Sequence, residues 1–437
     1  MDDTIFALAS AAGRAGVAVW RISGPRAGVA LAALTGRKLP APRQAALRSI
    51  LNPASGEPLD KGLVLWLPGP RSFTGEDCAE LHTHGGRAIA EAMITALGGL
   101  GLREAEPGAF SRRAVLNGKF DLTQAEAIAD LAAAETEAQR RQALAQAEGG
   151  LRDLYEGWRA EIVRLRAQIE AAIEFPDEDV GDPLKALWAA LANLRGAIAA
   201  HLADSRRGER LRGGIAVAVV GAPNAGKSSL VNALARRDVA IVSPEAGTTR
   251  DPIEVHLDLG GYPVTIVDTA GLRQAEGAIE AEGIARARAR VASADVVLAL
   301  FDAAIGEDIE TQEILDERAI AVFSKGDLAG RAYAHQPGER LTISVKTSAG
   351  IDKLLKILEE RVKSLASHAP VPPPTRARHR DALARCVAAL DAARAAPAPE
   401  LAAEELRRAG DELGRITGRI DIEETLDAVF RDFCIGK

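Results

Sequence analysis

The sequence predicts a multidomain protein with an α+β N-terminal domain, an α-helical domain, and an α/β domain inserted into the helical one. Its 437 residues exceed what one hydrophobic core usually holds. Segments rich in Ala, Leu, Glu and Arg, a composition typical of helices, flank a region in which strand and helix patterns alternate. Because the termini of a compact domain commonly lie close together, such an insertion is tolerated.

Residues 1–118 form the predicted N-terminal domain. Short apolar runs, such as residues 17–22 and 63–67, are separated by Gly and Pro, which indicates strands joined by turns. The helical domain begins at residue 119. The segment up to residue 175 has no proline and repeats apolar residues at helical spacing, and a second helical stretch follows from residue 183, so we expect long helices up to residue 212.

Residues 213–374 form the predicted inserted domain. Gly213 and Gly214 predict a hinge at its start, and the β-branched run 215–220 opens an alternation typical of a doubly wound parallel sheet. The proline-rich segment 370–374 favours an extended exit linker. Residues 375–437 then return to the helical pattern, so the predicted helical domain is discontinuous.

Composition limits the partners and the compartment that we expect. A formal net charge of −7 gives no global attraction for nucleic acid, so RNA binding needs a local basic patch or a partner protein. Cys78, Cys386 and Cys434 are widely spaced and odd in number, which suits neither a disulfide framework nor a zinc site and indicates a reducing cytosol. Without a signal pattern or a run of roughly 18 uncharged apolar residues, we expect a cytoplasmic protein that does not contact a membrane.

A phosphate-binding loop is predicted after the strand 215–220. Residues 221–228, Gly-Ala-Pro-Asn-Ala-Gly-Lys-Ser, fit the pattern G-x-x-x-x-G-K-[ST] and precede a helical pattern. In such a loop backbone N–H groups surround a phosphate, Lys227 neutralises the outer phosphates, and Ser228 binds magnesium. The alternative is a chance glycine-rich turn, and the flanking strand and helix argue against it.

Two later loops complete the predicted phosphate site. Residues 268–271, Asp-Thr-Ala-Gly, follow an apolar strand, where the carboxylate can hold the magnesium shell and Gly271 can donate its N–H to the terminal phosphate. The loop 247–251 supplies Thr249 as a second hydroxyl for magnesium. Each loop alone reads as an ordinary turn, but downstream of the phosphate loop they predict a Ras-like nucleotide domain.

The base is predicted to bind at residues 324–327, Ser-Lys-Gly-Asp, which follow the strand 320–323. The Asp327 carboxylate can accept hydrogen bonds from N1 and N2 of guanine, donors that adenine lacks. Residues 344–346 can close on the base through backbone N–H groups. The predicted ligand is therefore GTP with magnesium, and the predicted contacts are Asn224, Ala225, Gly226, Lys227, Ser228, Ser229, Ser243, Thr248, Thr249, Asp268, Thr269, Ala270, Gly271, Ser324, Lys325, Asp327, Ser344, Val345 and Lys346.

Several motifs are more specific than a phosphate loop. They are Asn224 inside that loop, Gly-Thr-Thr-Arg-Asp at 247–251, Asp-Thr-Ala-Gly-Leu-Arg at 268–273, Phe-Cys-Ile-Gly-Lys at 433–437, and N-terminal runs at 13–19, 73–77 and 120–127. Together they span almost the whole chain and resemble the bacterial tRNA-modifying GTPases of the MnmE or TrmE family. The resemblance implies a homodimer, formed through an N-terminal folate-binding and dimerisation domain, that works with the flavoprotein MnmG in a heterotetramer.

The resemblance also implies a reaction and its residues. The complex would add an aminomethyl-type group to carbon 5 of the wobble uridine of certain tRNAs, with 5-formyl- or methylene-tetrahydrofolate as the one-carbon source. Folate would contact Arg21, Glu80, Lys119 and Lys437, and Cys434 would lie near the transferred carbon. Without the resemblance, the four charged residues read first as surface ion pairs or solvated charges, and Cys434 as an inert thiol.

Two residues depart from the family's pattern. Ser324 stands where Asn is usual, so part of the support for the guanine site is expected to be lost or supplied by water. Val345 stands where Ala is usual, and the backbone donor survives that change.

The residue that activates the attacking water is not given by the usual motif. Leu272 stands where Ras-like proteins have a glutamine that orients this water. Arg250 and Arg273 are candidate arginine fingers, and each reads equally as a surface ion pair. The resemblance implies instead that two GTPase domains meet around a potassium ion, with Glu280 as the catalytic glutamate. The implied potassium ligands are Asn224, Ser243, Glu245 and Thr248. From the sequence alone, Glu280 reads first as a solvated residue of an acidic cluster.

Two other classes of function stay open. A non-enzymatic regulatory or ribosome-assembly GTPase switch shares the nucleotide site but leaves the N-terminal motifs and the Cys434 tail unexplained. An ATP-driven motor shares the phosphate loop but leaves Asp327 unexplained.

Overall fold

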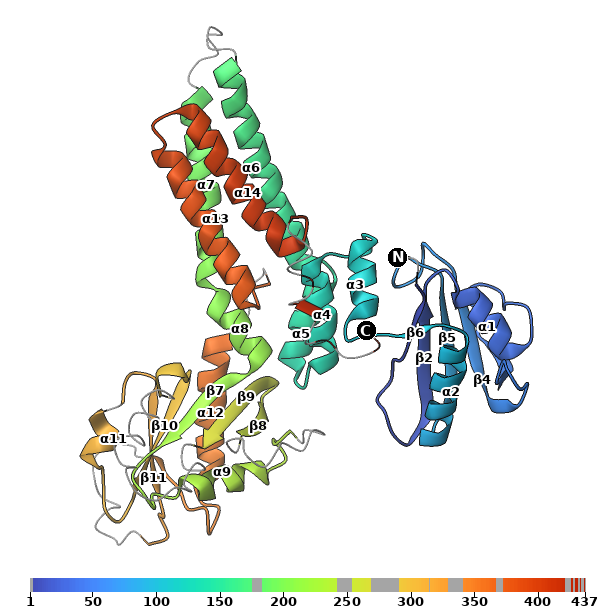
Figure 1. Cartoon of the computed structure of the whole chain (residues 1–437). Helices are drawn as coiled ribbons and strands as arrows, with labels where there is room; N and C mark the ends of the chain where they lie inside the picture. Colours follow the sequence, from blue (N-terminus) through green and yellow to red (C-terminus); the bar gives the residue numbers. More distant parts are fainter. Residues whose placement is uncertain are drawn as a thin grey trace, which may run out of the picture. The chain divides into compact units, whose positions relative to one another are not determined.

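The computed structural model describes residues 3–174, 183–241, 254–268, 291–313, 315–328, 341–366 and 372–420, together with residues 426, 429, 430, 433 and 436. The chain divides into two compact units, each assembled from separate stretches of sequence (Figure 1). The first comprises Met1–Ala132, Gln146–Leu191 and Ala388–Lys437, and the second comprises Ala133–Ala145 and Ala192–Val387.

The N-terminal part of the first unit is a six-stranded sheet with two helices on one face. The strand order is β3-β4-β5-β2-β1-β6, antiparallel except between β1 and β6. The elements are β1 (Ile5–Leu8), β2 (Ala15–Ser23), α1 (Ala27–Thr35), β3 (Ala46–Leu51), β4 (Pro58–Leu67), β5 (Cys78–Gly85), α2 (Arg87–Gly99) and β6 (Arg103–Glu104). Trp20 and Ile22 of β2 and Leu81 of β5 pack against both helices. Because side chains alternate along a strand, Arg21 and Glu80 lie on the other face of the sheet.

Helices make up the rest of the first unit. They include α3 (Ala109–Leu116), α4 (Leu122–Ala133), α6 (Gly150–Glu174) and α14 (Pro399–Thr417), while α5 (Glu137–Ala147), α7 (Pro183–Ala203) and α13 (Ala377–Ala395) run from one unit into the other. The long helix α6 packs along α14, where Ile162 lies beside Gly410. Segments on both sides of the inserted α/β region thus pair in one helical layer.

The second unit contains the α/β sheet, with strand order β12-β11-β10-β7-β9-β8, parallel except for β8. Its elements are α8 (Ser205–Gly213), β7 (Ile215–Val220), α9 (Lys227–Ala235), β8 (Glu254–Leu259), β9 (Tyr262–Asp268), β10 (Val296–Asp302), α11 (Ile309–Glu313), β11 (Ala319–Ser324), β12 (Leu341–Thr342) and α12 (Ile351–Ala366). Val217 and Val219 of β7 enter one apolar core, and Ala218 and Val220 enter another. A sheet buried on both faces explains the continuous apolar run. The predicted fold class is confirmed.

Helix α8 lies at the predicted boundary between the helical and the α/β domain. Helix α8 ends at Gly213, the first glycine of the pair, and its Leu211 lies in the core of the α/β sheet. Arg210 of α8 donates to Asp295 at 2.6 Å, and Asp295 also accepts the Ala216 N–H at 3.1 Å. Gly214, the predicted hinge, has a φ of +86°. The domain bounds 1–118, 119–212 with 375–437, and 213–374 therefore stay a prediction, since the compact units divide the chain elsewhere.

One helical stretch among the described residues, Ala186–Gly213, is long and apolar enough by composition to cross a membrane. This is weak support for a membrane span, because packed helices of soluble proteins meet the same criterion. Leu187, Leu191, Leu194 and Ile198 are buried at helical spacing, as expected of a helix with one packed face.

Candidate nucleotide-binding site

The phosphate loop begins at the carboxyl end of β7, and two glycines shape it. Gly221 has a φ of +152°, and a Cβ there would collide with the carbonyl oxygen of Leu300 on β10. Gly226 has a φ of +96° and directly precedes α9. Both conformations favour glycine, so the chain turns sharply from a buried strand into a helix whose N-terminus carries partial positive charge.

Lys227 lies inside this loop. Its Nζ donates to the carbonyl oxygens of Gly221 and Ala222 at 2.7 and 2.8 Å. Ser228, in the first turn of α9, is half-buried, and Asp268 ends β9 opposite Val219 of β7 in parallel register. Because the carboxyl ends of parallel strands meet at one edge of the sheet, the lysine charge and these two residues lie at the same edge.

The base loop follows β11 and is tied directly to the phosphate loop. The Ser324 hydroxyl, which is buried, donates to the Ala225 carbonyl oxygen at 2.6 Å and lies 3.1 Å from that of Phe301. The shorter side chain at this position therefore reaches the phosphate loop without a water molecule between them.

Two carboxylates organise the rest of the base loop. Lys325, with a φ of +55°, donates to Asp302 at 2.7 Å, and Ser344 donates to Asp327 at 2.7 Å. The hydrogen bond from Ser344 lowers the pKa of Asp327 below its usual value, so this exposed carboxylate is ionised at neutral pH. An ionised carboxylate at this position can accept both guanine donors.

The sequence reasoning missed Asp302. Burial raises the pKa of this carboxyl, but the hydrogen bond and charge of Lys325 together with the Ala304 N–H outweigh burial, and the net pKa is lowered. The available signal was an aspartate at the end of the apolar run 296–301, together with a lysine that directly follows the neighbouring strand.

Part of the predicted site lies outside the described residues. These residues are Ser243, Glu245, Thr248, Thr249, Arg250, Thr269, Ala270, Gly271, Leu272, Arg273, Glu280, Cys434 and Lys437. Of the predicted potassium ligands, the structure describes Asn224, which is exposed and has a φ of +62°.

A second polar site lies in the first unit, on the sheet face opposite the N-terminal core. Arg21 and Glu80 are cross-strand neighbours on β2 and β5, and the guanidinium donates twice to Glu80 Oε1, at 3.1 and 3.0 Å. The carbon of that guanidinium lies 5.1 Å from the ring centre of Phe73 and 5.8 Å from that of Phe110. Arg21 is thus a half-buried cation between aromatic rings, which the sequence reasoning did not anticipate.

The C-terminal tail and Lys119 approach the same part of the first unit. Arg21 Nη1 donates to the Gly436 carbonyl oxygen at 3.4 Å, although the two residues lie 415 positions apart. Lys119 Nζ donates to the Pro70 carbonyl oxygen at 2.8 Å, on the loop that carries Phe73. Arg21, Glu80, Lys119 and the tail, all predicted to serve one ligand, therefore belong to one compact unit.

The site in the second unit has two ends, the phosphate loop and the base loop. A guanine nucleotide fits both, with its phosphates in the first and its base at the second. The fold and this site define a P-loop GTPase, an enzyme that hydrolyses GTP. Residues 122–434 match the model of the MnmE helical domain, and residues 4–119 match that of the GTP-binding protein TrmE N-terminus. The chain belongs to the MnmE family, also called TrmE, and the predicted resemblance is confirmed.

Full-length relatives support this assignment. The proteins named tRNA modification GTPase MnmE from Paramagnetospirillum magneticum and Parvibaculum lavamentivorans are each 55% identical to this chain, over 442 and 444 residues, with 100% of both chains covered. The relative of that name from Rhodospirillum rubrum is 53% identical over 453 residues, covering 100% of this chain and 99% of its own. The family implies binding of GTP with magnesium.

Solved structures match parts of the chain. Era from Aquifex aeolicus bound to GDP.AlF4- is 25% identical and covers 40% of this chain and 66% of its own, with a TM-score of 0.27. The G domain of the FeoB iron transporter of T. maritima is 24% identical and covers 35% of this chain and 99% of its own, with a TM-score of 0.26. TM-scores this low carry no information about function.

Proposed function

We propose that the protein is a GTP-driven tRNA modification enzyme that acts on carbon 5 of the wobble uridine, together with a flavoprotein partner. The observation that carries this proposal is the match of the whole chain to relatives named tRNA modification GTPase MnmE. In the proposed reaction a tetrahydrofolate derivative supplies the one-carbon unit, and the protein acts in the cytoplasm as a homodimer.

The nucleotide site supports the GTP part of the proposal. Lys227 holds the outer phosphates, Ser228 with Thr249 holds magnesium, and Asp327, positioned by Ser344, reads guanine. Magnesium bound there neutralises charge between the outer phosphates. The remaining residues orient the nucleotide.

The Arg21 site has a donor set that fits a tetrahydrofolate. This ligand offers a flat ring system with adjacent N–H donors and a tail that carries carboxylates. Glu80 is a suitable acceptor for such donors, Arg21 and Lys119 are cations for anionic groups, and Phe73 and Phe110 provide apolar surface. We propose that Arg21, Glu80, Lys119 and Lys437 bind the folate and that Cys434 lies near its transferred carbon.

The proposal is tested on tRNA from a strain that lacks the gene. Nucleoside mass spectrometry should find the wobble uridine of the target tRNAs without its carbon-5 group, and the wild-type gene should restore it. A nucleoside profile that does not change would contradict the enzyme and favour the regulatory or ribosome-assembly switch. A competition experiment tests the ATP-driven motor. ATP should displace bound GTP readily if the protein is such a motor, and should fail to do so if it is a GTPase.

Cys434→Ser should remove most of the wobble-uridine modification and leave GTP hydrolysis within about twofold of wild type. The tail is proposed to serve the folate site, and the nucleotide site is built from other residues. Both quantities are measured with the same variant, tRNA modification in a strain that carries only this gene and phosphate release with purified protein. Normal modification would make the cysteine a bystander.

Water activation is proposed to depend on potassium and Glu280 because Leu272 cannot orient a water molecule. A potassium ion beside Asn224, enclosed by Ser243, Glu245 and Thr248, would offset charge that develops between the outer phosphates, as an arginine finger does. Glu280 would orient the attacking water. Arg250 and Arg273, as arginine fingers, are the second-ranked candidates for stabilising this charge.

Two measurements test this arrangement. GTP turnover should be at least about tenfold faster in potassium than in sodium at equal ionic strength, and Glu280→Ala should abolish hydrolysis without loss of GTP affinity. Glu276→Ala, in the same acidic cluster, is the matched control and should retain activity, while Arg250→Ala should cost less than Glu280→Ala. Equal rates in the two salts, or full activity of Glu280→Ala, would refute the mechanism and leave the GTP assignment intact.

A further inference from the structure

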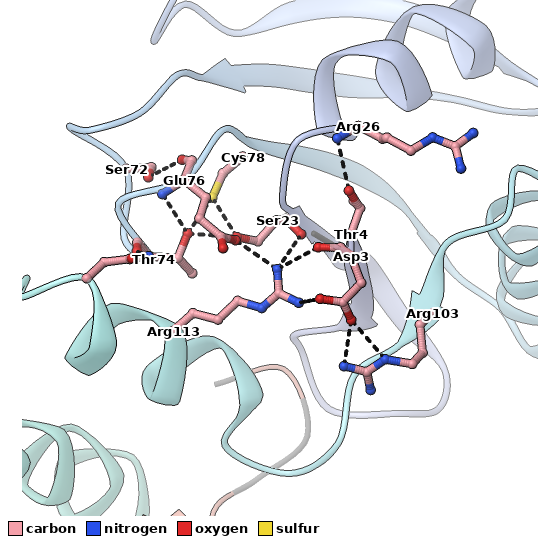
Figure 2. Close-up of polar contacts among 11 residues, drawn as sticks. Asp3, Thr4, Ser23, Arg26, Ser72, Thr74, Glu76, Cys78, Arg103 and Arg113 are labelled. Carbon is pink, nitrogen blue, oxygen red and sulfur yellow. Dashed lines mark hydrogen bonds and ion pairs between the residues drawn. The ribbon is translucent and has the colours of Figure 1, made fainter. Parts of the chain in front are cut away.

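A cluster of charged and hydroxyl side chains surrounds one buried arginine of the first unit (Figure 2). Its centre is Arg113 of α3, whose side chain is 2% exposed. The guanidinium donates to Asp3 Oδ1 at 2.6 Å and to Glu76 Oε2 at 2.9 Å, and also to the carbonyl oxygens of Asp3 and Ser23 at 3.0 and 3.3 Å. One side chain therefore joins the N-terminus, strand β2 and the loop 68–77.

The loop side of this cluster continues through hydroxyl groups. Ser23 donates to Glu76 Oε2 at 2.7 Å and lies 2.7 Å from the Thr74 hydroxyl, which lies 3.2 Å from Cys78 Sγ. Ser72 also donates to the Glu76 carbonyl oxygen. Figure 2 shows these side chains converging on the turn between β4 and β5.

The same loop forms one wall of the Arg21 site. Phe73 lies between Ser72 and Thr74 and places its ring against the Arg21 guanidinium. Helix α3 contributes the second ring, Phe110, three residues before Arg113 and on the same side of the helix. Asn117, at the end of α3, donates to the Thr74 carbonyl oxygen at 2.7 Å. Whatever fixes α3 to the loop therefore fixes both rings around Arg21.

Stability alone gives a weak account of the cluster. Removing the charges of Arg113 and Glu76 from water costs about as much free energy as their attraction returns, and apolar replacements of similar volume are often neutral or stabilising. Buried charges with directional partners do, however, hold segments in one geometry. The contacts of Arg113 end on the segment that carries Phe73.

We propose that Arg113 is a positioning residue of the Arg21 site. Arg113 belongs to helix α3 and binds the loop 68–77 through Glu76, so it fixes the helix and the loop relative to each other. Phe73 and Phe110 therefore stay at the distances at which both rings contact the Arg21 guanidinium. This inference rests on the proposed folate site and adds a residue that does not contact the ligand.

Arg103 provides a matched control because it binds the same carboxylate from the other side. Its Nε and Nη2 donate to Asp3 Oδ2 at 3.0 and 2.9 Å, and its Nη1 contacts the Glu104 carbonyl oxygen and the Glu106 carboxylate rather than the loop 68–77. Arg103→Met therefore removes an ion pair of Asp3 and leaves the link between Arg113 and Glu76 intact.

The experiment compares full-length wild type, Arg113→Met, Arg113→Lys and Arg103→Met by calorimetric titration with 5-formyltetrahydrofolate. Arg113→Met should bind the folate at least about tenfold more weakly, Arg113→Lys should fall between it and wild type, and Arg103→Met should stay within about twofold of wild type. GTP turnover should stay unchanged in all three, since the nucleotide site uses none of these residues. Melting temperatures show whether the two Met variants lose comparable stability.

Equal loss of folate affinity in both Met variants, or wild-type affinity of Arg113→Met, would overturn the inference. If Arg113→Met does not fold, the exposed Asn117→Ala replaces it; a loss of about threefold or more supports the inference and unchanged affinity refutes it. Absence of folate binding by the wild type would instead refute the proposed folate site, and the inference with it. The two failures are therefore distinguishable.

Discussion

Lys227→Ala should lower the rate of GTP hydrolysis at saturating GTP by at least roughly a hundredfold and also weaken GTP binding. The Lys227 ammonium lies within the phosphate loop, bonded to the carbonyl oxygens of Gly221 and Ala222. In the proposed site this charge neutralises the outer phosphates in the ground state and the transition state. The loop itself should survive the change, because the positive φ angles of Gly221 and Gly226 set its turn.

Phosphate release and titration with a fluorescent GTP analogue measure the two effects separately. Lys363→Ala is the matched control, since this lysine is half-exposed on α12 and pairs with Glu359. The control should hydrolyse GTP at the wild-type rate. Wild-type turnover by Lys227→Ala would mean that the phosphates bind elsewhere.

Asp327→Asn should lower GTP affinity by roughly a hundredfold and raise the affinity for xanthosine triphosphate. The Asp327 carboxylate accepts hydrogen bonds only, and its lowered pKa keeps it ionised at neutral pH. An asparagine amide presents an N–H group to the guanine donors, which leaves one pair unmatched. Xanthine has a carbonyl oxygen where guanine has its amino group, so the same amide suits it.

Competition of the two nucleotides for wild type and variant measures the change in selectivity. Asp316→Asn, an exposed aspartate that pairs with Arg318 in the same unit, is the control and should leave selectivity unchanged. If both forms of residue 327 bind GTP and xanthosine triphosphate equally, the base assignment is wrong.

Local motifs carried most of the prediction of the nucleotide site. The phosphate loop spans eight consecutive residues, so its chemistry depends on backbone conformations that Gly221 and Gly226 impose within the segment itself. The base loop is equally short. The departure at Ser324 was judged from side-chain length alone, and in the structure its hydroxyl donates directly to the Ala225 carbonyl oxygen.

The helical domain was predictable for a different reason. Apolar residues at helical spacing predicted helices in two distant segments, each with one face to bury, and the structure pairs α6 with α14. Helical spacing did not predict which compact unit each helix would join. Helix α8 packs on the α/β sheet through Leu211 and Arg210, and its helical composition gave no sign of which neighbour it would choose.

By itself, the sequence determined the three types of domain, the phosphate loop and the family, and it located the aspartate proposed to read guanine, because each of these is encoded in short runs or in regular spacing. Only the tertiary structure decided the environment of Arg21 and the contacts of Arg113. The first depends on Glu80, Phe73, Phe110 and Gly436, and the second on Asp3 and Glu76, residues that lie from tens to hundreds of positions away. Contacts over such separations depend on how strands pair and helices dock, and no local pattern of residues encodes that choice.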